Sequence, residues 1–207
     1  YNSATDSYEY STVSVVCFAA GTMIVVPEGE RRVEELEKGD LVVTLDHGVQ
    51  RLQKSLHRHL NFLKGDDPCH KPIEFKPDAL GFGVPSKRLV VSPQHRMLVQ
   101  SQLSDSSGQE TEILIGAKFL TQIEGIEVEQ NGRDVTYFHM LFDCHQVVEA
   151  EGALSESLFT GQEALKSLSP AARMEIAVLF PELFQPDLYH RPEPVRPLAT
   201  GAEGRDI

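Results

Sequence analysis

The chain has 207 residues, of which 41% are hydrophobic and 24% are charged. This balance is typical of a folded protein with one substantial core, and it excludes a disordered or fibrous chain. The net charge of −12 argues against nucleic-acid binding, which relies on clustered Lys and Arg, and no apolar run is long enough to cross a membrane.

Short aliphatic and β-branched runs follow one another between residues 13 and 159, separated by Gly, Pro, Asp and Asn. Such runs predict an antiparallel, mostly β domain. A polar lead-in over residues 1–12 precedes it and has no helical period. The predicted strands cover residues 13–18, 23–26, 41–45, 88–92, 97–100, 113–115, 126–129, 135–142 and 146–149.

Two turn signals and one proline-rich stretch interrupt these runs. Pro27-Glu28-Gly29 and Asn131-Gly132 predict hairpin turns, because glycine and asparagine tolerate a positive φ. Residues 66–85 contain four prolines, and they predict an irregular loop or insertion.

The pattern changes to a helical period after Gly161. Ser169 and Pro170 fit an N-cap and a first helical position, and they predict an amphipathic helix that ends near Pro181. Residues 185–207 are rich in proline and have no periodic apolar face, so we expect an extended tail there.

The three cysteines are Cys17, Cys69 and Cys144, and no C-x-x-C pair occurs. This spacing favours neither a zinc ribbon nor a dense disulfide framework. Because the count is odd, at least one thiol is free. A free thiol can be a buried core residue or a nucleophile, and Cys17 within its apolar surroundings fits both readings.

The surroundings of Cys17 form the most specific motif of the chain. A cysteine, an aromatic residue, a small residue and Gly-Thr are followed by Pro-x-Gly and then by Val-x-x-Leu-x-x-Gly-Asp, over residues 17–40. A Ser-x-x-His element follows at Ser92 and His95. Residues 135–152 then look like a late hairpin, with a strand, an Asp-x-His turn at Asp143 and His145, and a strand that ends in Ala-x-Gly. Together these motifs closely resemble the bacterial Hint (Hedgehog/intein-type) domain.

This resemblance implies an all-β, horseshoe-like Hint fold with pseudo-twofold halves over residues 17–161. Residues 1–16 would be the N-terminal flank, 162–184 a helical extension and 185–207 a flexible tail. No cofactor or metal is implied. The domain would act on its own N-terminal flanking polypeptide, as a monomer, inside a larger bacterial protein that is secreted or displayed at the cell surface.

The chemistry implied is an acyl shift. A Cys sulfur on the C-terminal side of a carbonyl can form a five-membered ring with it, so Cys17 would attack the carbonyl of Val16. By its place in the family pattern, His95 would protonate the leaving amide nitrogen and Ser92 would orient the amide. His145 occupies the place of the family's late histidine.

Two further residues are weaker candidates for this site. Asp143 lies in the same predicted turn as His145, where aspartate is also an ordinary turn former. His139 alternates with Phe138 and Met140 on a predicted strand, so it faces away from them. That placement is equally compatible with a scaffold residue and with a site residue.

The chain departs from splicing domains at its C-terminal end. Asparagine occurs only at positions 2, 61 and 131, so no asparagine near residue 157 can cyclise and cut a C-terminal bond. We therefore expect thioester formation, followed by attack of water or another external nucleophile, without ordinary splicing.

Two other functions stay open at this stage. The first is a degenerate Hint scaffold that no longer cuts and serves as an interaction or presentation module. The second is a metal site made from His57, His59, Cys69 and His70, although these residues have no recognised ligand spacing.

Overall fold

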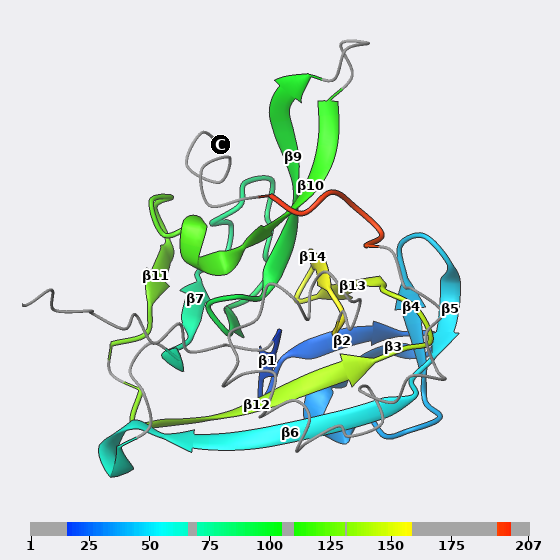
Figure 1. Ribbon diagram of the computed structural model, residues 1–207, viewed down its shortest axis with the longest axis horizontal. Helices are drawn as coiled ribbons and strands as arrows, with labels where there is room; N and C mark the ends of the chain where they lie inside the picture. Colours follow the sequence, from blue (N-terminus) through cyan, green and yellow to red (C-terminus); the bar gives the residue numbers. More distant parts are fainter. Residues whose placement is uncertain (1–15, 66–69, 105–109, 131, 159–193, 200–207) are drawn as a thin grey trace, which may run out of the picture.

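A computed structural model describes residues 16–65, 70–104, 110–130, 132–158 and 194–199, which form two β-sheets (Figure 1). All pairs of named strands in this part of the chain are antiparallel, as the short strands and turns predicted. The all-β Hint fold expected from the sequence is confirmed.

The first sheet has six strands and contains the start of the domain. Its order is β11 (Ile126–Val128), β7 (Ile73–Phe75), β8 (Leu89–Val91), β1 (Phe18–Ala19), β12 (Asp134–Leu141) and β6 (Lys54–Asn61).

The second sheet has eight strands. Its main path is β10 (Glu110–Gly116), β9 (Arg96–Ser104), β14 (Ala153–Glu156), β13 (Val147–Ala150), β2 (Met23–Val26) and β3 (Gly29–Arg32). Beside this path, β4 (Leu41–Thr44) pairs with β13 and with β5 (Gly48–Arg51). The described helices are the short 3-10 turns η1 (Val33–Glu35), η2 (Phe62–Lys64) and η4 (Ala117–Phe119), and none of them could span a membrane.

The main core contains buried residues from both sheets and holds them together. The six-stranded sheet contributes Phe18, Phe75 and Met140, and the eight-stranded sheet contributes Ile24 and Met97 among others. Burial of these large side chains is the main stabilising contribution to the fold.

A second, smaller cluster contains Cys17, Leu60 and Tyr137. Side chains alternate along a strand, so Tyr137 and His139 of β12 face one side of the sheet and Met140 the other. In the pairing of β1 with β12, Phe18 lies opposite Phe138, and this register places Cys17 opposite His139.

Three local predictions from the sequence are wrong. The strands beside Asn131-Gly132 do not form a hairpin, because β11 pairs with β7 whereas β12 pairs with β6 and β1. The Asp143 to His145 turn does not close a hairpin either, since β12 and β13 belong to different sheets and residues 142–146 connect them. The proline-rich stretch at 66–85 contains strand β7.

The hairpin predicted at Pro27-Glu28-Gly29 joins β2 to β3, and Gly29 there has a φ of 126°. Strand β6 went unpredicted because it is rich in polar residues and histidine, yet it pairs with β12 over its whole length. The lead-in at 1–12 and the predicted helix ending near Pro181 lie outside the described residues.

Candidate active site

Cys17 immediately precedes β1, which runs between β8 and β12. Its side chain is buried, with 4% of the residue exposed. The backbone is held firmly because Ser92 N–H donates to the Cys17 carbonyl at 3.0 Å and Ala20 N–H donates to the Thr136 carbonyl at 2.9 Å. The peptide bond between Val16 and Cys17 is therefore held on a rigid strand.

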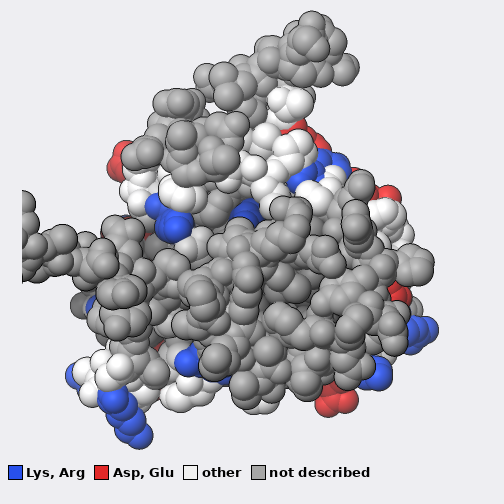
Figure 2. All heavy atoms as spheres, viewed as in Figure 1, with Lys and Arg blue, Asp and Glu red and all other residues white. Residues whose placement is uncertain are grey.

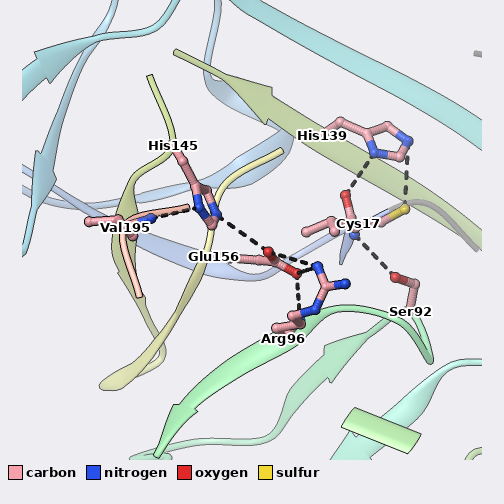
Figure 3. Close-up of polar contacts among 8 residues, drawn as sticks. Cys17, Ser92, Arg96, His139, His145, Glu156 and Val195 are labelled. Atoms are coloured by element: carbon pink, nitrogen blue, oxygen red, sulfur yellow. Dashed lines mark hydrogen bonds and ion pairs between the residues drawn. The ribbon is translucent and has the colours of Figure 1, made fainter. Parts of the chain in front are cut away.

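His139 contacts both the sulfur of Cys17 and the carbonyl that precedes it (Figure 3). Its Nε2 lies 3.5 Å from Cys17 Sγ, and its Nδ1 lies 2.8 Å from the carbonyl oxygen of Val16. A carbonyl oxygen can only accept, so Nδ1 carries the hydrogen and donates. In the neutral ring Nε2 is then an acceptor that faces the thiol.

Ser92 contacts the other side of the same peptide bond. It follows β8, is fully buried, and its Oγ accepts the Cys17 N–H at 3.1 Å. The bond between Val16 and Cys17 thus has His139 at its carbonyl oxygen and Ser92 at its nitrogen.

His95 is buried beside the same strand. Its ring packs edge-on against Phe18, with 4.3 Å between ring centroids. Neither ring nitrogen has a hydrogen-bond partner among the described residues. The Cys17 backbone lies close enough to the His95 ring to favour its protonated form. The distance and angle between them do not amount to a hydrogen bond.

Burial keeps all three titratable groups of this site neutral. It raises the pKa of the Cys17 thiol far above its usual value, and a hydrogen bond with Ser92 and the charge of Arg58 oppose that shift only in part. Burial lowers the pKa of His139 to about 4 and the pKa of His95 to about 3. At neutral pH the resting site is therefore a thiol beside a neutral imidazole.

His145 and Asp143 belong to other groups of contacts. Figure 3 shows His145 in a separate set of contacts from Cys17, with its Nε2 3.3 Å from Glu156 Oε2. Glu156 also accepts from the backbone and the guanidinium of Arg96, at 3.0 and 3.1 Å. Asp143 is exposed and accepts from Gln53 at 3.0 Å. That His145 and Asp143 take part in the Cys17 site stays a prediction.

The sequence motifs do not single out Glu156. In the structure it is fully buried among residues 155–158, and a buried acidic residue is normally paired with a charge.

The histidines considered for a metal site have other contacts. His57 stacks on Phe138 with 5.6 Å between ring centroids, and His59 Nδ1 lies 3.0 Å from Thr136 Oγ1. Within the described ranges no group of three or more His, Cys, Asp or Glu could hold a metal ion, and Cys69 lies outside those ranges.

The comparison with known families agrees with this geometry. The family model described as a Hint domain matches residues 16–162. The chain belongs to the Hint domain family. This membership supports autoprocessing or splicing-type chemistry in general, and the matched range begins at the residue whose carbonyl contacts His139.

Several solved structures are similar to this Hint domain. A bacterial intein-like domain from Clostridium thermocellum has 15% sequence identity and a TM-score of 0.42, covering 70% of this chain and 99% of that one. The gp41-1 intein has 15% identity and a TM-score of 0.40, covering 69% of this chain and 98% of its own. The Ssp DnaB mini-intein variant M86 has 9% identity, a TM-score of 0.40, and coverages of 72% and 97%. No curated protein matches the chain.

Proposed function

We propose that this Hint domain cleaves the bond between Val16 and Cys17 through a thioester on Cys17, and passes its N-terminal flank to water or to another external nucleophile. The observation that carries the proposal is the double contact of His139, with the attacking sulfur on one ring nitrogen and the attacked carbonyl on the other.

In the first step Cys17 Sγ attacks the Val16 carbonyl carbon. The thiol proton passes to His139 Nε2, and the Nδ1–H of the imidazolium that results stabilises the negative charge on the carbonyl oxygen. Because the resting thiol is not ionised, proton transfer and attack occur together. One histidine thus acts as the base and as the donor to the oxyanion.

In the second step the bond from the carbonyl carbon to Cys17 nitrogen breaks, and the nitrogen gains a proton to become a free amine. Ser92 holds this nitrogen, and His95 is the nearby ring with unpartnered nitrogens that can deliver the proton. His139 then releases its proton to the medium and His95 takes one proton up from the medium, so both rings end neutral. The product is a thioester between the Val16 acyl group and Cys17 sulfur.

Release completes the reaction. Water attacks the thioester, leaving a carboxylate at Val16 and restoring the Cys17 thiol. The C-terminal end stays intact, because the residues there are Ser155, Glu156 and Ser157 and no asparagine lies beyond position 131. The guanidinium of Arg96 contacts both side-chain oxygens of Glu156, so this side chain is already engaged.

A degenerate scaffold is the second candidate function. The observation that favours it is the deep burial of Cys17, which raises the pKa of the thiol and restricts the approach of water. A scaffold of this kind would keep residues 1–16 attached under all conditions.

The experiment that separates the two functions is a mass measurement. The purified chain is incubated with dithiothreitol at neutral pH, because an external thiol captures a thioester and leaves an amide intact. An active domain loses the mass of residues 1–16, and the released peptide carries one dithiothreitol molecule on Val16.

Three variants make the result specific. Cys17→Ala should release nothing, and His139→Gln should slow release by about 10²–10⁴-fold, as for a lost general base. The matched control is His57→Gln, which removes an exposed histidine of the neighbouring strand β6 and should leave the rate unchanged. Release from Cys17→Ala at the rate of the unaltered chain would overturn the proposal.

A further inference from the structure

Residues 194–199 lie against β10, the terminal strand on the main path of the eight-stranded sheet (Figure 1). Leu114 N–H donates to the Pro197 carbonyl at 2.9 Å, and Ala199 N–H donates to the Leu114 carbonyl at 2.9 Å. Leu114 and Leu198 form a parallel bridge. The segment therefore satisfies backbone groups of β10 that face away from β9.

Arg196 adds a charged contact between this segment and two separate parts of the domain. Its Nε donates to Glu112 Oε2 of β10 at 2.7 Å, and its Nη2 donates to Asp46 Oδ1 in the β4–β5 turn at 2.7 Å. The Arg196 side chain is only 23% exposed. Figure 2 shows acidic and basic atoms side by side below the β9–β10 hairpin.

The segment also covers the buried polar group around His145. Val195 N–H donates to His145 Nδ1 at 3.3 Å, and Ala199 packs against the main core. Since Nδ1 accepts a hydrogen bond, a neutral His145 carries its hydrogen on Nε2, which faces Glu156. Three kinds of contact thus hold the same six residues: strand pairing, a paired charge and a cap on a buried histidine.

We propose that the outer edge of β10, together with Asp46 and Glu112, is a docking site for an extended peptide segment that carries an arginine. Its occupant is residues 194–199 of this same chain. The docking site keeps the polypeptide downstream of Leu158 attached to the Hint domain, including after a cut anywhere between residues 159 and 193. This inference does not depend on the acyl-transfer chemistry.

Amide hydrogen exchange, followed residue by residue by NMR on the full chain, tests the docking. Arg196→Glu should speed exchange of the Leu114 and Ala199 amides by at least tenfold. The Ile113 and Ile115 amides, which face β9, should keep their exchange rates and so report that the sheet is intact. The matched control Arg32→Glu makes the same charge change at an exposed position of β3 and should alter neither set.

A peptide with the sequence of residues 192–201 identifies the occupant. Added in excess to the Arg196→Glu chain, it should restore protection at Leu114, whereas the same peptide with Arg196→Glu should not. In the unaltered chain, protection should be independent of protein concentration. The proposal is overturned if Arg196→Glu leaves Leu114 and Ala199 protected, or if their protection rises with protein concentration, which would assign the segment to a second copy.

Discussion

His139 differs from an ordinary buried histidine because both of its ring nitrogens face reacting groups. One contacts Cys17 Sγ and the other the Val16 carbonyl. Burial of such a ring costs free energy of folding unless its hydrogen bonds compensate. Burial also lowers the pKa of the ring, and so sets the pH range in which the ring can act as a base.

The first prediction concerns this pH range. Burial lowers the pKa of His139 from its ordinary 6.5 to about 4, so the ring is a neutral base at every pH above that value. With dithiothreitol at concentrations where the release rate no longer rises with added thiol, so that the acyl shift limits the rate, flank release should stay nearly constant from pH 8 to about pH 5.5 and fall as the pH approaches about 4. Circular dichroism at each pH checks that the fold persists, and a midpoint near 6.5 in a folded sample would contradict the role of His139.

The second prediction separates activity from stability at His95. The side chain is buried, and neither ring nitrogen has a partner within the described part of the chain. His95→Leu should therefore leave the free energy of unfolding unchanged or raise it by about 1–2 kcal/mol, because an unsatisfied polar group is removed. Release should slow by about 10²–10⁴-fold.

Urea unfolding and the mass measurement on the same sample check this pair of effects. A His95→Leu chain that is much less stable and releases its flank at the normal rate would show that His95 is a packing residue.

Parts of the site could be predicted from single residues. The family motif selected Cys17 and Ser92, and strand alternation placed His139 on the face away from Met140. The positions of His145 and Asp143 could not be predicted, because the short connection between β12 and β13 crosses from one sheet to the other. Residue spacing tells which face of a strand a side chain is on. It does not tell which strand lies beside it in the sheet.

At the scale of strands, β12 organises the site because it pairs with β1 on one edge and with β6 on the other. Strands with β-branched and aliphatic runs were predictable, whereas β6, with its polar residues, was not. Its stability comes from eight registered pairs with β12 and not from its own propensity. Asn131-Gly132 failed as a hairpin signal because long-range pairing overrode a local turn preference.

The third prediction concerns the connection between β14 and β9. Glu156 joins them through Arg96, and its side chain is fully buried. Glu156→Ala should lower the free energy of unfolding by about 3 kcal/mol, because Arg96 and His145 would lose their buried partner. Glu149→Ala on the neighbouring strand β13 is the control and should change it by less than about 0.5 kcal/mol, since Glu149 is exposed. Equal effects in urea unfolding would contradict the importance of this ion pair.

For the whole molecule, the two buried histidines whose pKa values are lowered, His95 and His139, contribute to the response to acid. Burial lowers the pKa of His95 to about 3 and of His139 to about 4, whereas both return to about 6.5 in the unfolded chain. Below pH 6.5 the unfolded chain therefore binds protons that the folded chain does not, and stability falls as the pH is lowered.

The fourth prediction gives the size of this effect. The free energy of unfolding should fall by about 2–3 kcal/mol per pH unit between about pH 6 and pH 4 through these two residues, which urea titrations at each pH measure. His95→Leu should remove about half of this slope. A slope that does not change in this variant would show that other groups control acid unfolding.

The fifth prediction concerns the fate of both flanks. With the domain placed between two tag proteins, we expect release of the N-terminal tag and no ligated tag–tag product, because no asparagine beyond position 131 can form a succinimide. Gel electrophoresis over a day follows both species. A ligated product would show that another residue between 143 and 162 replaces asparagine.

The two flanks meet the folded domain at adjacent residues of β12. The Val16 carbonyl accepts from His139, and Leu158 N–H donates to the Met140 carbonyl at 2.9 Å. A mechanical pull on the N-terminal flank would load the contact between Val16 and His139 directly, whereas a pull on the C-terminal flank would first load the docked residues 194–199. The contact between Val16 and His139 would then break before the fold does. Tension on the N-terminal flank would thus switch off acyl transfer in a domain that remains folded.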